Sequence, residues 1–282
     1  MAKNKRVLEV AVISDVHLGT YGCNAAELHK YLKSIQPKTL ILNGDIIDIW
    51  QFSKSYFPNA HMKIIKQIFS MASKGVEVYY VTGNHDEMLR KFEGFTMGTL
   101  KIVNKVVLEL DGKKAWVFHG DVFDTTMKHS KWLAKLGAVG YDFLIILNAA
   151  VNFFSEKLGR GKVSFSRRIK NSVKSAVKFI DDFEQTAAEI AISNQYDYVV
   201  CGHIHNPEIK NIKTAQGTVT YLNSGDWVEN LTALEYKDKQ WSMYHYQQDQ
   251  GVDIEGQEDE DTSMDISVLY KNLLEEFQPK KV

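Results

Sequence analysis

Aspartate, histidine and asparagine side chains recur directly after apolar runs in this chain, and these residue types can bind metal ions. The first run, residues 10–13, is followed by Asp15 and His17. Because residues i and i+2 of an extended chain point to the same side, both side chains can enter one site. This pair alone is weak evidence, since loop aspartates and histidines often follow strands.

Later apolar runs end in the same way, and their polar residues are Asp45, Asn84, His85, His119, His203 and His205. Ligands bind outside the carboxyl ends of the strands in open sheets, so we expect these side chains to share one site. Carboxylate, imidazole and amide ligands without thiolate suit divalent Mn, Fe or Zn. Because even the seven of these residues other than His85 are too many ligands for one open catalytic ion, we predict two ions, roughly 3.5–4 Å apart, sharing one carboxylate. Such a pair can clamp a phosphoryl group and activate a water.

Elements that position these residues can be predicted from hydrophobic patterning. Buried strands are predicted at 10–13, 39–42 and 76–81, with helices between them at about 24–35 and 61–73. Asn24 and Glu27 have the spacing of a helix-capping box. This alternation predicts parallel strand pairing. Residues 102–118 predict a hairpin around Asp111-Gly112, and strands resume from 198 to about 246.

Composition changes along the chain predict four parts. We expect a core formed by 1–124 and 195–248, a helical insertion at 125–194, an acidic linker at 249–262 and an amphipathic segment at 263–282. The amphipathic segment has apolar residues at helical spacing: Ile266, Leu269, Tyr270, Leu273, Leu274 and Phe277. A chain of 282 residues can bury a sizeable core.

Charge and cysteine content limit the classes of partner and compartment. A formal net charge of −1 argues against a globally electrostatic partner such as bulk nucleic acid, although residues 127–180 carry eleven Lys and Arg against two acids. Only Cys23 and Cys201 are present, which favours a reducing compartment. We predict no signal peptide, and the apolar run at 141–152 is too short to span a bilayer. The expected location is cytoplasmic, and peripheral contact with the inner face of the cell membrane is the alternative.

The ordered motifs Asp-x-His, Gly-Asp, Gly-Asn-His-Asp, His-Gly-Asp and Gly-His-x-His resemble those of the calcineurin-like metallophosphoesterase family, over residues 7–246 outside the insertion. The resemblance implies an α/β (α+β) fold, a four-layer αββα sandwich. It also implies that one metal is held by Asp15, His17, Asp45 and His205. The other metal would be held by Asp45, Asn84, His119 and His203.

The resemblance makes Asp45 the bridging ligand and places His85 near the leaving-group oxygen, as a proton donor or charge stabiliser. Three further aspartates follow the motifs: Asp86, Asp121 and Asp226. They either orient ligand imidazoles or form turns, and the residues alone favour neither role. The expected cofactors are two divalent ions, most simply Mn²⁺, with Fe or Zn as alternatives.

Within that family the layout is most similar to the bacterial UDP-2,3-diacylglucosamine pyrophosphatase group, which acts in the lipid A pathway. The similarity includes the insertion after Gly120-Asp121 and the 225–228 stretch. One departure is His85, where the characterised branch has arginine. The resemblance implies that the insertion is a lid holding acyl chains and a diphosphate; its candidate substrate-binding residues are Arg167, Lys170, Asn171, Lys174 and Lys178. The alternative is a helical cap with a solvated basic face.

We expect a hydrolase acting on a nucleotide-linked glycolipid. A soluble nucleotide or phosphodiester is the competing substrate. A nuclease-like protein is a less favoured alternative, because the basic insertion lacks alternating stacking aromatic residues. An interaction scaffold with a relic site is disfavoured because every motif position is filled. The sequence does not define an oligomeric state.

Overall fold

The computed structural model describes residues 5–50, 56–125 and 166–246; for residues 125 and 166–175 only the backbone is described. All the described elements belong to one compact unit, and the acidic linker and amphipathic segment predicted from the sequence lie outside the described residues. Among the described helices, none combines the length and apolar composition needed to cross a membrane.

A seven-stranded sheet has the strand order β12-β11-β1-β2-β3-β5-β4. Its strands are β1 (Arg6–Ile13), β2 (Ile35–Asn43), β3 (Glu77–Val81), β4 (Thr96–Met97), β5 (Leu100–Val103), β11 (Thr232–Lys237) and β12 (Gln240–His245). Strands β1, β2, β3 and β5 pair in parallel, as the strand-helix-strand alternation predicts. The carboxyl ends of β1, β2 and β3 therefore meet at one edge.

A five-stranded sheet has the order β6-β7-β8-β10-β9. Its strands are β6 (Lys105–Leu110), β7 (Lys113–Phe118), β8 (Tyr198–Cys201), β9 (Glu208–Thr214) and β10 (Gly217–Asn223). The predicted Asp111-Gly112 hairpin is confirmed, because β6 and β7 pair antiparallel across it. Strands β7, β8 and β10 are parallel, so their carboxyl ends also share an edge.

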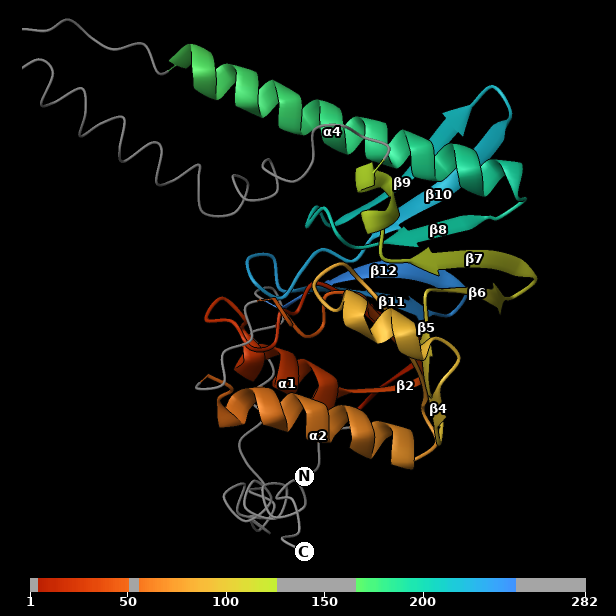
Figure 1. Ribbon diagram of the computed structural model, residues 1–282. Helices are drawn as coiled ribbons and strands as arrows, with labels where there is room; N and C mark the ends of the chain where they lie inside the picture. The colour runs from red at the N-terminus through yellow and green to blue at the C-terminus, as the bar shows by residue number, and fades with distance from the viewer. Residues whose placement is uncertain (1–4, 51–55, 126–165, 247–282) are drawn as a thin grey trace, which may run out of the picture. The chain divides into compact units, whose positions relative to one another are not determined.

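Helices cover the outer faces of the two sheets, giving the predicted αββα order of layers (Figure 1). Helices α1 (Ala25–Ser34) and α2 (Asn59–Ser73) pack on the seven-stranded sheet, and α4 (Ser166–Ser193) packs on the five-stranded sheet. Between the sheets lies a third apolar layer that includes Val12, Ile41 and Val200. The β-branched runs read from the sequence form strands because both of their faces are buried.

Helix α4 is part of the crossover between two parallel strands. It connects β7 to β8, and Phe183, Ala187 and Ala188 pack against the outer face of the five-stranded sheet. The last part of the segment predicted as an insertion therefore contributes to the core of the fold. The boundaries of that segment stay a prediction, because residues 126–165 lie outside the described residues.

The prediction of a capping box at the start of α1 is wrong, because the expected side-chain hydrogen bond of Asn24 is not formed. Asn24 occupies the N-cap position, but its side chain makes no capping hydrogen bond. Its Nδ2 instead donates to the carbonyl oxygen of Val228 at 2.7 Å. Asn24 therefore ties the loop after β1 to the 225–228 loop, a long-range contact that local spacing cannot predict.

Candidate metal centre

The predicted ligands lie at the carboxyl ends of parallel strands in both sheets. Loops after β1, β2 and β3 carry the residues from the seven-stranded sheet, and loops after β7 and β8 carry those from the five-stranded sheet. The side chains from these loops form three groups of possible metal ligands; two of them, called the two clusters below, contain residues from both sheets, and the third, His17, Asp48 and His85, comes from the seven-stranded sheet alone. The five strand ends read from the sequence thus belong to one site.

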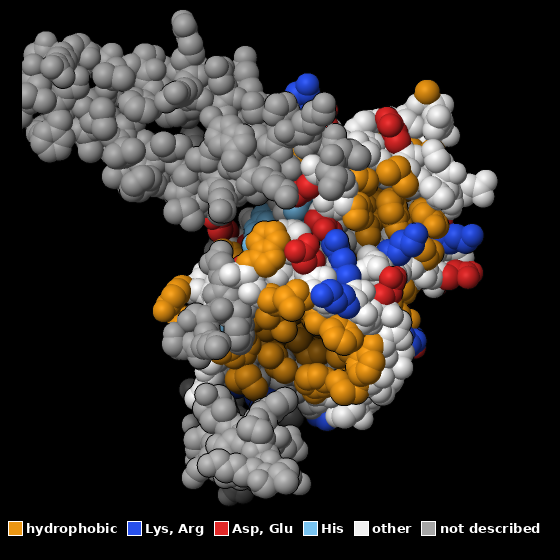
Figure 2. Space-filling model, in the orientation of Figure 1, with side chains coloured by type: hydrophobic (Ala, Val, Ile, Leu, Met, Phe, Trp, Pro, Cys, Tyr) orange, Lys and Arg blue, Asp and Glu red, His pale blue; other side chains and the backbone are white. Residues whose placement is uncertain are grey.

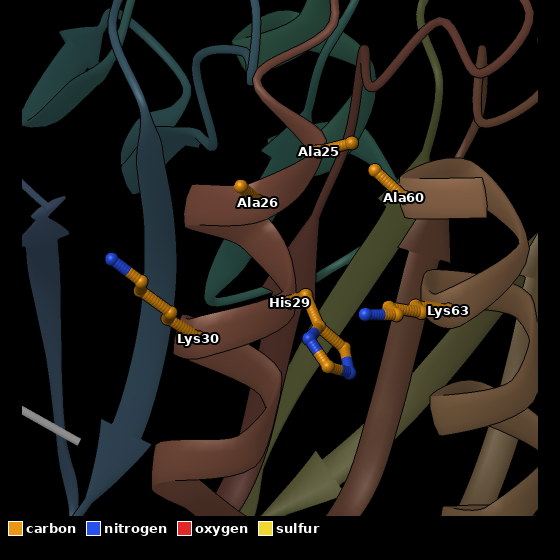
Figure 3. A pocket seen from close by; sticks show the side chains of 6 residues that line it. All are labelled: Ala25, Ala26, His29, Lys30, Ala60 and Lys63. Carbon is orange, nitrogen blue, oxygen red and sulfur yellow. The ribbon is translucent and has the colours of Figure 1, made fainter. Parts of the chain in front are cut away.

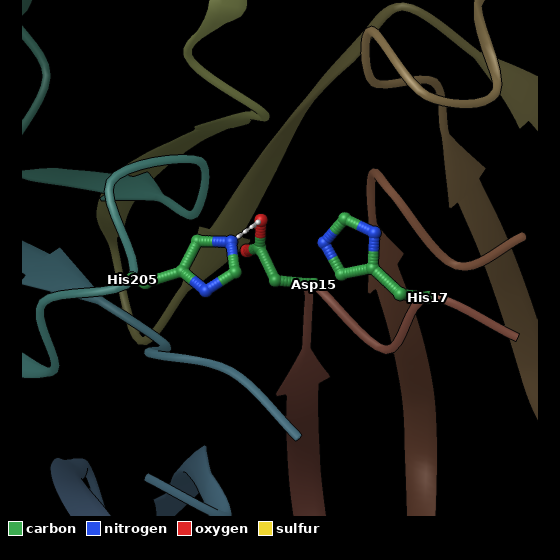
Figure 4. A group of neighbouring side chains, drawn as sticks. All are labelled: Asp15, His17 and His205. Carbon is green, nitrogen blue, oxygen red and sulfur yellow. Dashed lines mark ion pairs between the residues drawn. The ribbon is translucent and has the colours of Figure 1, made fainter. Parts of the chain in front are cut away.

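The first cluster consists of Asp15, His17 and His205 (Figure 4). Their candidate ligand atoms lie within 4.8 Å of one another. The carboxylate lies between the two rings, with His205 Nε2 3.2 Å from Asp15 Oδ1. Asp15 is fully buried, so its charge needs close cationic partners.

The second cluster consists of Asp45, His119 and His203, with candidate ligand atoms within the same 4.8 Å. His119 Nε2 lies 3.2 Å from Asp45 Oδ2. The other carboxylate oxygen of Asp45 accepts a hydrogen bond from the backbone N–H of His85 at 2.8 Å. The backbone N–H of His203 donates to Asp15 Oδ2 at 3.1 Å, so the two clusters are neighbours.

Two of the predicted ligand histidines have one ring nitrogen fixed by an oxygen atom. His119 Nδ1 lies 2.8 Å from the carbonyl oxygen of Asn43. A carbonyl can only accept, so Nδ1 carries a proton and Nε2 is the nitrogen that faces the site. His203 Nε2 lies 3.0 Å from Asp124 Oδ1, which leaves Nδ1 for the site. Such contacts are typical of metal-binding histidines.

Asp48 is a site residue that the sequence analysis missed. Its Oδ2 lies 3.3 Å from Nδ1 of His17 and 2.9 Å from Nδ1 of His85, and the residue is buried. It therefore joins a predicted ligand to the predicted proton donor. A usable signal was present, because an aspartate among Ile46, Ile47 and Ile49 is expected to be buried and so to need partners.

The roles of Asp86, Asp121 and Asp226 are now distinguishable. Asp86 accepts hydrogen bonds from the backbone N–H groups of Ile46 and Gly83, and so shapes the loops that carry the ligands. Asp121 pairs with Arg90. Asp226 accepts from three successive backbone N–H groups of its own loop and also lies 3.7 Å from His205 Nδ1, so it combines both predicted roles.

The backbone is strained where the ligands lie. Five of the predicted ligands have φ between 51° and 68°, in the left-handed region that non-glycine residues rarely adopt: Asp15, His17, Asp45, His203 and His205. Such conformations each cost of order 1–3 kcal/mol and cluster at functional sites. Gly44 also has φ of +80°, and a Cβ there would lie 2.3 Å from the ring of His119. The Gly-Asp motif therefore needs glycine for close packing as well as for the turn.

Electrostatics favour positive charge in the site. Burial opposes ionisation of Asp45, but His119 outweighs it and lowers the pKa of Asp45 to about 2. Burial likewise opposes ionisation of Asp15, yet His205 and nearby imidazoles hold its pKa below the usual range. Burial favours neutral His205, but Asp15 and Asp226 raise its pKa to about 9. The carboxylates thus stay ionised and hold protons on neighbouring imidazoles.

Unpaired buried atoms test whether metal ions fit. Asn84 Oδ1 is buried and has no hydrogen-bond partner within the described part of the chain; Asp15 Oδ1 and His119 Nε2 are also buried and have only their 3.2 Å ion-pair contacts, without a well-directed hydrogen bond. An unpaired buried polar atom is costly, and a coordinated cation would satisfy all three. Oxygen and imidazole donors suit divalent transition ions. The residues present therefore fit divalent metals at both clusters.

The predicted substrate-binding residues are described only in part. Arg167, Lys170, Asn171 and Lys174 belong to α4, but their side chains lie outside the described residues. Lys178 is on the same helix and is exposed. The predicted lid residues 126–165 are likewise not described.

A groove between α1 and α2 is distinct from the metal centre (Figure 3). It is lined by Ala25, Ala26, His29, Lys30, Ala60 and Lys63, none of which belongs to either cluster. His29 and Lys63 project into it from facing helices. Its lining contains no carboxylate that could help to hold a metal.

An αββα sandwich with divalent-ion ligands at the carboxyl ends of its strands defines a class of metal-dependent phosphoesterases. Residues 8–207 match the calcineurin-like phosphoesterase family, and the chain belongs to that family. The resemblance inferred from the motifs is thereby confirmed. The protein is a metal-dependent hydrolase.

Similar proteins share one name at low identity. The UDP-2,3-diacylglucosamine hydrolase of Aliivibrio fischeri is 22% identical over 242 residues, covering 84% of this chain and 98% of that protein. The protein of the same name from Vibrio cholerae is 28% identical over 232 residues, covering 79% and 93%. A solved archaeal phosphodiesterase covers 84% of this chain and 98% of its own at 14% identity, with a TM-score of 0.42. That structural likeness supports no argument about function.

Proposed function

We propose that the chain is a two-metal phosphoester hydrolase that cleaves UDP-2,3-diacylglucosamine to UMP and 2,3-diacylglucosamine 1-phosphate. The convergence of buried carboxylate and imidazole ligand atoms from both sheets carries the two-metal part. The substrate part is supported by the shared name of the relatives.

Two divalent ions are assigned to the two clusters. Asp15, His17 and His205 would hold one ion, and Asn84, His119 and His203 would hold the other. Asp45 would be the ligand that both ions share. We assign Mn²⁺, because imidazole-rich sites prefer transition ions to Mg²⁺. The bound ions would supply Lewis acidity and a water of lowered pKa.

His85 is assigned as the group that protonates the leaving oxygen. Burial favours its neutral form, but Asp48 raises the pKa of His85, so the ring holds a proton more readily than a free imidazole. Asp48 also fixes the ring by its contact with Nδ1, which leaves Nε2 as the donating atom. Asp48 is therefore a positioning residue for His85 and His17.

We assign the binding of the substrate's diphosphate and acyl chains to the insertion. Basic residues Arg167, Lys170, Lys174 and Lys178, with Asn171 beside them, recur along α4 at helical spacing. A cationic helix face is suited to a diphosphate. The run at 141–154, which lies outside the described residues, would hold acyl chains and contact the inner face of the membrane by its apolar sequence.

A soluble nucleotide or phosphodiester is the second candidate substrate. It is favoured by His85, which stands where the characterised pyrophosphatase branch has arginine. His85 also lies next to the exposed ring of Trp50, at 4.8 Å between ring centroids, so this side of the site is aromatic rather than cationic.

A substrate panel tests the assignment. Mn²⁺-loaded protein is assayed with UDP-2,3-diacylglucosamine, a soluble nucleotide diphosphate sugar and a chromogenic phosphodiester, with chelator-treated protein as the control. We expect the lipid-linked substrate to have the highest kcat/KM, and chelator to abolish all three reactions. A higher kcat/KM for a soluble substrate would contradict the assignment of a lipid-linked substrate and favour the soluble one. Full activity in chelator would contradict the two-metal assignment.

A further inference from the structure

Exposed apolar side chains are concentrated on three neighbouring elements. We call this surface the apolar face; it comprises Phe69, Met88, Phe92, Phe95 and Met97. These residues come from α2, the short helix η1 (Glu87–Phe92) and the region of β4, and each is between 44% and 56% exposed. Figure 2 shows a broad hydrophobic surface in this region of the molecule. Large exposed patches of this kind mark interaction sites in soluble proteins.

Hydrogen bonds hold the elements of the apolar face together. The backbone N–H of Phe95 donates to Phe92 O at 2.9 Å, and that of Ile102 donates to Phe95 O at 3.0 Å. Thr99 Oγ1 donates to Ala72 O at 3.0 Å, which joins the β4–β5 turn to α2. The face is therefore a fixed surface, with its apolar side chains supported by the seven-stranded sheet.

Lysines accompany the apolar face. Lys66, Lys74 and Lys91 are exposed on or beside the same elements, and no ion pair is formed by any of the three in the part of the chain that the structure describes. Helix α2 contains no acidic residue. The nearby exposed acids are Glu87 and Glu93, and Glu93 is bonded to Asn104. The surroundings of the face thus carry a small excess of positive charge.

One end of the apolar face, at η1, follows the metal centre directly in the chain. Helix η1 begins directly after Asp86, and therefore two residues after His85. Arg90 of η1 pairs with Asp121 of the next short helix, η2 (Asp121–Thr125), at 2.5 Å. Asp124 of η2 in turn contacts the ligand His203. One continuous set of contacts therefore connects the face with both sheets' contributions to the centre.

We propose that the apolar face docks onto the surface of an anionic lipid bilayer. Phenylalanine and methionine side chains would enter the boundary between headgroups and acyl chains, and the lysines would contact anionic headgroups. Edge-to-edge strand pairing with a second copy of the chain is a poorer fit, because the exposed edge strand β4 is only two residues long. This proposal rests on the proposed function, because docking would give the enzyme access to a lipid-linked substrate in the same bilayer.

Vesicle flotation of the full-length, metal-loaded protein tests this proposal. The vesicles contain phosphatidylethanolamine with phosphatidylglycerol, and phosphatidylcholine vesicles serve as the neutral comparison. The Phe92→Asp, Phe95→Asp double variant should bind anionic vesicles at least ~10-fold more weakly than the wild type. Val107→Asp is the matched control, because Val107 is also 44% exposed but lies on β6 of the other sheet; it should bind as the wild type does. Lys66→Glu with Lys91→Glu should weaken binding to anionic vesicles and leave binding to neutral vesicles unchanged.

Other outcomes would overturn the docking assignment. Wild-type binding by the Phe92→Asp, Phe95→Asp variant, with loss of binding in Phe153→Asp, would assign docking to the insertion alone. A wild-type dimer that the double variant converts to a monomer, without vesicle binding, would assign the face to a second copy. Hydrolysis of the lipid substrate in detergent micelles separates the two proposals. If micellar hydrolysis persists without vesicle binding, only the docking proposal fails; if vesicles are bound but the substrate is not cleaved, only the substrate assignment fails.

Discussion

The two sheets contribute different chemistry to the same centre. Loops of the seven-stranded sheet carry every oxygen donor among the predicted ligands, namely Asp15, Asp45 and Asn84, together with His17. Loops of the five-stranded sheet carry only imidazoles, namely His119, His203 and His205. Neither sheet alone holds both the negative charge and the full set of imidazoles that an ion would need.

This difference shows that the centre depends on the alignment of the sheets. Each cluster combines carboxylates from one sheet with imidazoles from the other. Hydrogen bonds beneath the site join the sheets: Ser14 Oγ lies 2.6 Å from Ser224 Oγ, and Asn43 Nδ2 donates to Phe118 O at 3.1 Å. The protein should therefore lose most activity when the seven-stranded sheet loses its shared carboxylate, and least when one of these connections is removed.

Asp45→Ala should have the largest effect. It removes the carboxylate assigned to both ions, so we expect kcat/KM for a chromogenic phosphodiester to fall by about 10⁴-fold or more. His119→Ala removes one imidazole from the other sheet and should cost less. Steady-state kinetics at saturating Mn²⁺ measure both. A smaller loss for Asp45→Ala than for His119→Ala would contradict the bridging assignment.

Asp48→Asn should have an intermediate effect. The amide keeps the shape but loses the charge beside His85 and His17, and loss of such an orienting partner typically costs 10–100-fold. His85→Ala should lose about 10²–10⁴-fold in kcat while keeping its bound metal, as expected for a proton donor. Metal analysis of each purified variant, alongside kinetics, separates the roles. Loss of metal from His85→Ala, with unchanged turnover per bound ion, would make His85 a ligand instead.

The pH dependence of metal binding should reveal the raised pKa of His205. The metal-free imidazole has a pKa of about 9 against the usual 6.5, so its proton must leave when a metal binds. Apparent Mn²⁺ affinity should therefore rise as pH increases towards 9, with proton release detectable by calorimetry. The stability of the metal-free protein should change with pH in the opposite direction. The stabilisation from charged His205 is complete below pH 6.5 and is lost as pH rises to 9. In His205→Gln, both the pH dependence of Mn²⁺ affinity and the pH dependence of the stability of the metal-free protein should become weaker. If neither changes, the role assigned to this histidine is wrong.

Ser14→Ala should have the smallest effect on activity. It removes the Ser14–Ser224 bond and the bond to Gly225 O, both buried between the sheets. We expect the free energy of unfolding to fall by about 1–3 kcal/mol, with kcat/KM reduced much less than by any ligand change. Denaturant titration and kinetics measure these effects. A loss of activity as large as that of His119→Ala would show that this connection controls the ligand geometry itself.

Sequence reasoning located the centre because its signal is local. A buried strand followed at once by a polar motif can be read from neighbouring residues, and parallel pairing then predicts that the strand ends meet. Asp48 and Asp124 were missed because their importance depends on contacts with His85 and His203, 37 and 79 residues away in sequence. Asn24 was misread for the same reason, since its partner Val228 lies across the fold. The assignment of individual ligands stays a prediction.

Metal content of the purified protein tests the central claim most directly. After loading with Mn²⁺ and removal of free ions, elemental analysis of the wild type and of Asp45→Ala should give two ions per chain and fewer than one, respectively. His205→Ala and His119→Ala, each altering one cluster, should each retain about one ion. Two ions retained by Asp45→Ala, or no more than one bound by the wild type, would contradict a two-metal centre bridged by Asp45 and formed by both sheets.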